Sequence, residues 1–334
     1  MPMLNQIMCG DCTDLIRDLP SASVNLVITS PPYYHQRDYG GGIGSESTIE
    51  AYIATLIDVM RECLPVLHPT GSIVFNLGDK YEDSSLLLVP YRFAIEATKQ
   101  LPLTLVNAIT WVKRNPTPRQ FKRRLVSSTE PFFHFVKSDE YYYDIDAFLR
   151  ADEDEKPSNG GGVNLGRTYY DLIEQSSLST AQKDHARAAL DEVIQEVRDG
   201  RIAGFRMKIR GIHSEPFGGQ AGGRQIQMTK NGFTVIRLHG NPMKRDVIEM
   251  AVESLKGRNH PAMYPVELVK EFLYLLTRKG DTVLDPFMGS GSTAVACKLT
   301  GRNYIGFDLN PDYCRAAEER LANVPQLKFS SLWH

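Results

Sequence analysis

An apolar run, Val24 to Ile28, broken only by Asn25, leads directly into the motif TSPPYY at 29–34. Such a run is typical of a strand that is covered on both faces, as in a parallel sheet. It belongs to an alternating series of strand-like and helix-like segments: strand 24–29, helix 50–67, strand 72–77, helix 87–99, and strands 105–112 and 132–136. This alternation predicts an α/β fold with a doubly wound, mostly parallel sheet.

The alternation stops near residue 150 and resumes near residue 259. The block between them, 150–258, contains the glycine-rich stretches SNGGGVNLG and GGQAGGR, with a helical pattern at 180–199 and a strand pattern at 233–238. The last part gives a helix from Pro265 toward Arg278, strand 282–285, helix 291–300, strand 303–307 and helix 311–322. We therefore expect 1–149 and 259–334 to form two halves of one domain, with 150–258 as an inserted lobe.

The bulk composition limits the environment and the partners. The 334 residues carry a formal net charge of −2, so attraction to a polyanion has to come from local basic patches. The opening MPMLNQIMCGDC lacks the basic start and apolar core of a secretory segment. Five cysteines, an odd number, suit a reducing cytoplasm. Cys9 and Cys12 have C-x-x-C spacing, but no second ligand pair follows at finger spacing, so no metal site is expected.

The segment DPFMGSGST at 285–293 has the pattern strand, Gly289-x-Gly291, helix, which is typical of a nucleotide-cofactor turn. Glycine permits sharp dihedrals and close approach of a ligand, and the following helix presents free N–H groups. Asp308 ends the next strand, where a carboxylate can accept hydrogen bonds from two ribose hydroxyls. Asp285 ends the preceding strand, where it can meet an α-ammonium group.

Two cofactors fit this turn. Gly289-x-Gly291-x-x-Ala294, with an acidic residue at Asp308, also satisfies the NAD fingerprint. S-adenosylmethionine is favoured by Asp285, which a pyrophosphate would repel, and by the short chain beyond Asp308, which leaves little for the second half of a dinucleotide fold. An NAD-dependent oxidoreductase is therefore kept as an alternative.

The TSPPYY loop suits the activation of an aromatic amine. The exocyclic amine of cytosine or adenine is a poor nucleophile, and hydrogen-bond acceptors beside it draw its delocalised lone pair out of the ring plane. The Ser30 hydroxyl and the Pro31 carbonyl are the expected acceptors, in a loop that Pro31 and Pro32 make stiff. Tyr33 offers a ring on which a base extruded from a duplex can stack. Methylation of a ring carbon needs a cysteine nucleophile, usually in a Pro-Cys loop, and the chain has no Pro-Cys dipeptide.

With these motifs in this order, the chain resembles the β-class amino-DNA methyltransferases of restriction–modification systems. In that class an (S/D/N)PPY loop precedes the target-recognition region, and an FxGxG turn comes last. Further resembling segments are CGDCTDLI at 9–16, ITWVKRNPTP at 109–118, RLVSSTEPFFHFVKS at 124–138, HPAMYPVEL at 260–268 and YIGFDLNPDY at 304–313. The resemblance implies S-adenosylmethionine as cofactor, a flipped base of double-stranded DNA as substrate, and a circularly permuted, Rossmann-like sheet that brings Asp308 near Asp11.

The resemblance also assigns roles. Asp11 would meet the adenine of the cofactor, Asp308 its ribose, and the segment that begins at His260 its methionine end. The expected cofactor-binding residues are Asp11, Thr29, His260, Pro261, Asp285, Phe287, Gly289, Ser290, Gly291, Ser292, Thr293 and Asp308, and the expected catalytic residues are Ser30, Pro31, Pro32 and Tyr33. Serine in the first loop position resembles the cytosine-N4 enzymes, whereas aspartate is more typical of the adenine-N6 enzymes, which are the near alternative. Asn76 and Asp79 follow the next strand and are hypothetical assistants to the serine.

Two groups of basic residues are expected to contact DNA phosphates, the alternative being an ordinary solvated face. They are Lys113, Arg114, Arg119, Lys122, Arg123 and Arg124, and, in the inserted block, Arg206, Lys208, Arg210 and Arg224. Arg224, Gln225 and Gln227 are candidates for reading base edges. The other expected partner is a cognate restriction endonuclease that acts on the same site, and the protein is expected to be a monomer or homodimer, prokaryotic or phage-encoded. A non-catalytic DNA-binding module is the remaining alternative.

Overall fold

The computed structural model describes residues 3–36, 42–116, 121–149, 166–202, 204–213, 224–238, 244–253 and 264–324. The chain divides into two compact units. Unit 1 comprises Met1–Leu149 and Arg245–His334, and unit 2 comprises Arg150–Lys244. The two ends of the chain therefore build one body, which the middle of the chain interrupts.

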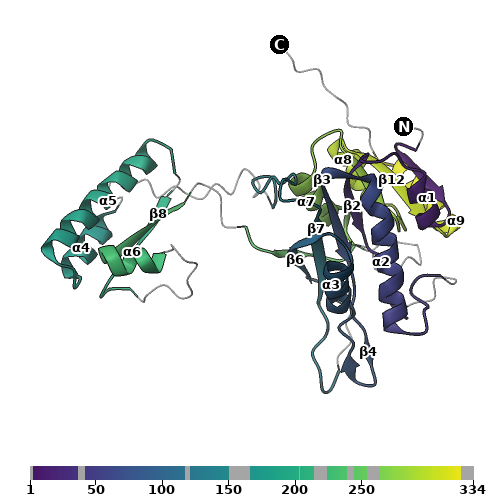
Figure 1. Ribbon diagram of the computed structural model, residues 1–334, viewed down its shortest axis with the longest axis horizontal. Helices are drawn as coiled ribbons and strands as arrows, with labels where there is room; N and C mark the ends of the chain where they lie inside the picture. Colours follow the sequence, from purple (N-terminus) through teal and green to yellow (C-terminus); the bar gives the residue numbers. More distant parts are fainter. Residues whose placement is uncertain are drawn as a thin grey trace, which may run out of the picture. The chain divides into compact units, whose positions relative to one another are not determined.

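Unit 1 is built on an eight-stranded sheet with the order β1-β12-β11-β2-β3-β7-β6-β10 (Figure 1). The strands are β1 (Gln6–Cys9), β12 (Asn303–Asp308), β11 (Thr282–Asp285), β2 (Val24–Thr29), β3 (Leu67–Asn76), β7 (Thr129–Val136), β6 (Thr104–Lys113) and β10 (Val247–Met250). Neighbouring strands are parallel except that β7 runs antiparallel to both β3 and β6. The predicted α/β class with a mostly parallel sheet is confirmed.

Helices cover both faces of this sheet. One apolar cluster packs α1 (Cys12–Arg17), α2 (Ile49–Val66) and α3 (Val89–Gln100) onto one face, and another packs α7 (Val266–Leu276), α8 (Ser292–Thr300) and α9 (Pro311–Ala322) onto the opposite face. Successive residues of a strand point to opposite faces, so Val27 lies in the first cluster and Leu26 and Ile28 in the second. This explains why β2 and the second half of β3 are mostly apolar rather than alternating.

The first and last strands of unit 1 lie side by side. β1 pairs in parallel with β12, with Cys9 opposite Asp308, and the Gly10 N–H donates to the Asp308 carbonyl at 3.0 Å. In Figure 1 this pairing joins the purple N-terminal part of the chain to its yellow C-terminal part. The circular permutation implied by the resemblance is thus present in the strand order.

Unit 2 has its own apolar core. It comprises α4 (Arg167–Gln175), α5 (Thr180–Arg198), β8 (Gly204–Ile209), α6 (Arg224–Asn231) and β9 (Phe233–Leu238), and its core includes Leu190, Met207 and Phe233. The Ser179 side chain caps α5, and Gln182 returns the hydrogen bond in a capping box.

The far end of the predicted inserted block packs with unit 1. β10 pairs in parallel with β6, with Ile248 opposite Trp111, and the Trp111 indole N–H donates to the Met250 carbonyl at 2.9 Å. The compact middle unit therefore ends at Lys244, whereas the sequence pattern placed the boundary at 258. Within the described ranges, no helix is both long enough and apolar enough to span a bilayer.

Candidate active site

The polar residues singled out in the sequence collect at one edge of the sheet. Strands β12, β11, β2 and β3 are parallel neighbours, so their carboxyl ends meet there. These ends carry Asp308, Asp285, Thr29 and Asn76, and Ser30 follows Thr29 directly. In open α/β sheets ligands bind outside the carboxyl ends of the strands.

Asp285 is the buried centre of the cofactor side. Among the described residues, its Oδ1 accepts hydrogen bonds from Thr29 Oγ1 at 2.6 Å and from the Phe287 N–H at 3.1 Å. Its Oδ2 accepts from Thr293 Oγ1 at 2.6 Å and from Tyr264 Oη at 2.9 Å. Burial raises the pKa of the Asp285 carboxyl, and these donors oppose that shift. The contacts tie the ends of β2 and β11 to the start of α8 and to the segment before α7.

The glycine turn after β11 is closed by backbone geometry that only glycine adopts readily. Gly289 and Gly291 have φ values of +52° and +83°. A Cβ on Gly291 would lie 2.9 Å from Ala317 Cβ of α9, whereas one on Gly289 would meet nothing nearer than Phe287 O at 3.9 Å. Gly291 thus permits close packing of the helices, and the space beside Gly289 is open to a ligand.

Asp308 holds this turn from the neighbouring strand. Its Oδ2 accepts from the Gly289 N–H and its Oδ1 from the Asn310 N–H, both at 2.9 Å. On the other side, Arg320 of α9 donates to the Ser290 carbonyl at 3.4 Å and to Ser292 Oγ at 3.1 Å. Ser290 and Ser292 are therefore placed by protein contacts at the start of α8.

Asp11 lies at the neighbouring edge of the sheet, at the N-terminus of α1. Its Oδ1 accepts from the Thr13 N–H at 2.8 Å and from Thr13 Oγ1 at 2.6 Å. The side-chain hydrogen bond from Thr13 is the main cause that lowers the pKa of Asp11. Because β1 pairs with β12, Asp11 and Asp308 follow the ends of adjacent strands. A carboxylate at each end, with the open glycine turn, fits a cofactor that carries an adenine, a ribose and an amino acid.

The TSPPYY loop is held in place by contacts with α2 and with the segment that follows β3. Tyr52 of α2, which is fully buried, donates its hydroxyl to the Pro32 carbonyl at 2.8 Å. Gln36 Nε2 donates to the Asp79 carbonyl at 2.9 Å. A Cβ on Gly78 would lie 2.4 Å from the Tyr33 ring, so glycine at 78 is required for that ring to pack where it does. The loop is therefore fixed on the ends of β2 and β3.

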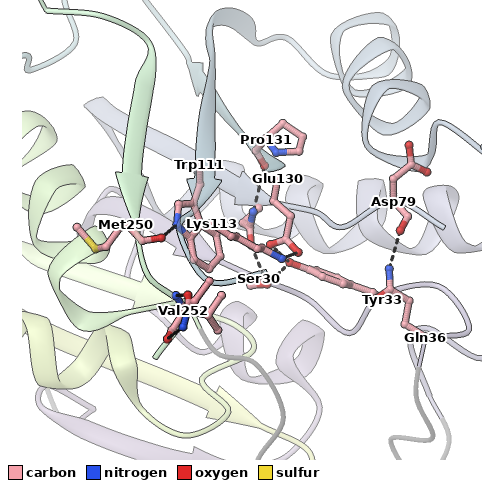
Figure 2. Close-up of polar contacts among 12 residues, drawn as sticks. Ser30, Tyr33, Gln36, Asp79, Trp111, Lys113, Glu130, Pro131, Met250 and Val252 are labelled. Carbon is pink, nitrogen blue, oxygen red and sulfur yellow. Dashed lines mark hydrogen bonds and ion pairs between the residues drawn. The ribbon is translucent and has the colours of Figure 1, made fainter. Parts of the chain in front are cut away.

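Ser30 and Tyr33 meet two further polar side chains, Asn76 and Glu130, of which Figure 2 labels Glu130. Ser30 Oγ lies 3.2 Å from Asn76 Oδ1 and 3.1 Å from Tyr33 Oη. Tyr33 Oη lies 2.8 Å from Asn76 Oδ1 and 3.1 Å from Glu130 Oε2. Asn76 is oriented by its own Nδ2, which donates to the Pro131 carbonyl at 3.1 Å. Burial, and then the nearby Glu130 carboxylate, raise the pKa of Tyr33 well above its usual value.

Glu130 is paired with a cation on the adjacent strand. Lys113 of β6 forms an ion pair with Glu130 of β7, and their side chains are only 17% and 13% exposed. The Lys113 ammonium also lies 5.1 Å from the centre of the Trp111 ring. Lys113, expected from the sequence at a DNA phosphate, is thus occupied in holding Glu130.

Sequence reasoning did not single out Glu130 or Tyr264. Both lie inside quoted segments, RLVSSTEPFFHFVKS and HPAMYPVEL, but no local pattern shows that they reach Tyr33 and Asp285. Of the two hypothetical assistants, Asn76 does contact Ser30. Asp79 instead accepts from the N–H groups of Lys80 and Val89 at 2.9 and 3.1 Å, so its carboxylate serves the start of α3.

The basic residues differ in what they contact. Arg114, Lys122 and Arg123 are exposed after β6. The Arg124 guanidinium lies between the Tyr81 and Phe121 rings, 3.7 and 3.8 Å from their centres.

In unit 2, Arg206 and Lys208 lie on the face of β8 opposite the core residues Met207 and Ile209, and Arg206 is exposed. Arg210 donates to the Thr229 carbonyl at 2.7 Å and so joins β8 to α6. Gln227 Oε1 accepts from Thr234 Oγ1 at 2.7 Å. Arg119, His260 and Pro261, and the side chains of Arg224 and Gln225, lie outside the described residues.

A glycine turn and a Pro-Pro loop on adjacent strands, at the carboxyl edge of a permuted sheet, define an α/β enzyme that binds a nucleotide-bearing cofactor beside a second substrate. The family model described as DNA methylase, of the N6/N4 type, matches residues 24–319, and the chain belongs to this family. The family uses S-adenosylmethionine as methyl donor, so the NAD-dependent alternative is discarded.

Similar proteins agree with this assignment. The type II methyltransferase M.Cfr9I of Citrobacter freundii is 26% identical, over 93% of this chain and 86% of its own length. The structure of the PvuII DNA methyltransferase, which is described as cytosine-N4-specific, is 17% identical with a TM-score of 0.58, over 95% of this chain and 90% of its own. A Thermus thermophilus protein crystallised with S-adenosylmethionine is 21% identical with a TM-score of 0.54, over 96% and 94%. These two structures share the fold.

Proposed function

We propose that this DNA methyltransferase transfers the methyl group of S-adenosylmethionine to the exocyclic 4-amino group of a flipped cytosine. The observation that carries the proposal is Ser30 in the first loop position, with its hydroxyl 3.2 Å from the neutral amide oxygen of Asn76. A loop that begins with serine resembles the loop of the cytosine-N4 enzymes. The alternative to cytosine-N4 methylation is methylation of adenine at N6.

The loop residues act on the amine directly. Ser30 Oγ and the Pro31 carbonyl accept its hydrogen bonds and draw the lone pair out of the ring plane. Pro31 and Pro32, with the hydrogen bond from Tyr52 to the Pro32 carbonyl, keep these acceptors in place before the reaction. The Tyr33 ring supplies a surface for stacking, and its hydroxyl is held by Asn76 and Glu130.

The other edge of the site holds the cofactor. Asp308 and Asp11 would hold the ribose and the adenine of S-adenosylmethionine, and the open side of Gly289 would let the backbone approach it closely. When bound there, S-adenosylmethionine supplies an electrophilic methyl group. The Asp285 carboxylate accepts hydrogen bonds from the hydroxyls of Thr29, Thr293 and Tyr264 and so fixes the shape of the glycine turn. We also propose that it contacts the α-ammonium group of S-adenosylmethionine.

DNA binding is proposed to use both units. The exposed cations Arg114, Lys122 and Arg123 of unit 1 and Arg206 of unit 2 can neutralise phosphates. Unit 2 would select the target sequence, since it is a separate compact body inserted into the catalytic one. A restriction endonuclease with the same recognition site is the proposed partner.

The test is single-molecule sequencing of DNA from cells that lack other methyltransferases and express this protein. We expect N4-methylcytosine in one short sequence context, and none when Ser30→Ala is expressed at the same level. N6-methyladenine in one context would overturn the choice of base. Unmodified DNA from cells with soluble, folded protein would favour a binding module without catalysis.

A further inference from the structure

A continuous chain of polar atoms leads from the TSPPYY loop to a carboxylate. Ser30 Oγ lies 3.1 Å from Tyr33 Oη, and Tyr33 Oη lies 3.1 Å from Glu130 Oε2. Both spacings permit hydrogen bonds, with Ser30 donating to Tyr33 and Tyr33 donating to Glu130. Figure 2 shows the labelled side chains of Ser30, Tyr33 and Glu130 directed toward one another.

Methylation of an exocyclic amine leaves a proton to be removed. As the nitrogen–carbon bond forms and the sulfur–carbon bond breaks, the electron pair of the broken bond stays on sulfur and the positive charge passes to the amine. The amine then has one proton more than the neutral product. Ser30 is a weak base, and the Asn76 amide does not accept a proton at neutral pH. Among the described residues that contact Ser30 or Tyr33 through a hydrogen bond, Glu130 is the carboxylate.

We propose that Glu130 is the terminal acceptor of the amine proton, which it receives through the hydroxyls of Ser30 and Tyr33. The amine gives its proton to Ser30 Oγ, the Ser30 hydroxyl proton moves to Tyr33 Oη, and the Tyr33 proton moves to Glu130 Oε2. Both hydroxyls end the step neutral, the product amine is neutral, and Glu130 becomes a carboxylic acid. Glu130 does not touch the base and acts through Tyr33. The inference rests on the proposed function only in requiring that an exocyclic amine is methylated.

Two surrounding contacts suit this role. The ion pair with Lys113 fixes Glu130 on the rigid β6–β7 pair. Tyr33 Oη has a second acceptor, Asn76 Oδ1 at 2.8 Å, toward which it can turn when Glu130 is protonated. The change of partner needs only a rotation of the Tyr33 hydroxyl, because both acceptors lie within hydrogen-bonding distance of Oη.

Three variants test the relay in a single-turnover assay on duplex DNA with saturating S-adenosylmethionine. Tyr33→Phe keeps the stacking ring and removes the middle hydroxyl. Glu130→Gln keeps an acceptor for Tyr33 and removes the base. We expect each to lower the methyl-transfer rate about 100-fold, within the usual range for a general base. The double variant should be no slower than the slower single one, because both changes break the same chain.

The controls separate a relay from a structural role. Glu62→Gln removes a more exposed ion pair, to Arg17, and should leave the rate within twofold of wild type. Binding of S-adenosylmethionine by calorimetry, and fluorescence of 2-aminopurine at the target position, should stay within twofold in every variant. The wild-type rate should fall on the acid side of its pH profile, and Glu130→Gln should lose that limb. The titratable groups that contact Glu130 are Lys113 and Tyr33.

The results that overturn the relay are also distinct. Multiplicative losses in the double variant, or a Glu130→Gln enzyme with wild-type rate and pH profile, would contradict it. If Glu130→Gln does not fold, Tyr33→Phe carries the test through the same acid limb, which it should lose and which its retention would overturn. If the protein methylates adenine, the proposed base is wrong but the relay is tested on adenine with the same variants.

Discussion

Two carboxylates near the same edge of the sheet, Asp285 and Glu130, lie in opposite surroundings. Asp285 is fully buried and is surrounded by hydroxyl and N–H donors of the protein itself. Glu130 is 13% exposed, is paired with Lys113, and meets one phenol that has a second acceptor to turn to. The comparison indicates that the cofactor side is built to hold its loops still, whereas the substrate side is built to let a proton move.

The largest expected effect breaks the cofactor side. Asp285→Ala would leave the Thr29, Thr293 and Tyr264 hydroxyls without their buried acceptor, so we expect a loss on the order of 4 kcal/mol in the free energy of unfolding. Urea titration measures it. Glu62→Gln removes the ion pair to Arg17, which is far more exposed than Asp285, and should lower the free energy of unfolding by under about 1 kcal/mol. Equal losses in the two variants would contradict the structural role of Asp285.

The next effect separates the pH dependence of stability from that of the proton relay. His134 lies on β7, four residues after Glu130, and burial lowers its pKa to about 4 from 6.5. Its Nε2 shares a hydrogen bond with Ser72 Oγ at 2.9 Å, while its Nδ1 has no partner among the described residues. Between about pH 6.5 and 4, His134 therefore binds a proton in the unfolded chain but not in the folded state.

Stability should consequently fall by up to about 3 kcal/mol between pH 6.5 and 4, and the contribution is fully present above pH 6.5. Urea titrations across this range, with His134→Leu as the comparison, measure it. The variant should lose the part of the slope that His134 causes. An unchanged slope in the variant would show that His134 is not the source, and the acid limb of the activity profile would then have to be separated from unfolding by other means.

The sequence predicted the elements of the fold that carry a long hydrophobic pattern. The mostly apolar strand Val24–Thr29 and the amphipathic helix that begins at Ile49 have the expected bounds within one residue. β1 and β10 were not predicted, because each has four residues and pairs with a strand that is remote in sequence. Local patterns cannot show such pairings.

The same limit applies to the candidate site, because only motifs that are contiguous in sequence could be predicted. The Ser30 loop and the glycine turn are contiguous motifs, so the sequence alone was enough to propose both as parts of the site. Glu130 reaches Tyr33 only because β7 pairs antiparallel with β3 in a register that places Phe132 opposite Asn76. Tyr264 reaches Asp285 through the folding of a segment that precedes α7. Contacts that depend on strand register or loop closure have no signature along the chain.

A smaller effect sharpens the comparison within the substrate side. Asp79→Ala should cost about 1 kcal/mol of stability, because its carboxylate accepts the first N–H of α3, and should leave the methyl-transfer rate within twofold. Asn76→Ala should lower that rate by at least about tenfold, since Ser30 and Tyr33 both contact its amide oxygen. Urea titration and single-turnover kinetics give the two numbers. A slow Asp79→Ala enzyme with a normal Asn76→Ala enzyme would reverse the assignment.

The smallest effect concerns the DNA contacts. Lys122→Ala removes an exposed cation after β6, and should reduce the salt dependence of DNA affinity by about one phosphate contact without a change of target sequence. Fluorescence anisotropy over a series of salt concentrations measures the slope. Lys99→Ala, an exposed cation of α3, is the matched control and should leave the slope unchanged. Equal slopes for Lys122→Ala and wild type would remove this residue from the interface.

The most direct test of the whole account is nucleoside mass spectrometry of duplex DNA after incubation with the purified protein and S-adenosylmethionine labelled in its methyl group. We predict labelled N4-methylcytosine with the wild type, and a yield slower by about 100-fold or more with Ser30→Ala at unchanged cofactor affinity. Labelled product at the wild-type rate from Ser30→Ala, or label on any atom other than an exocyclic amine, would contradict the account.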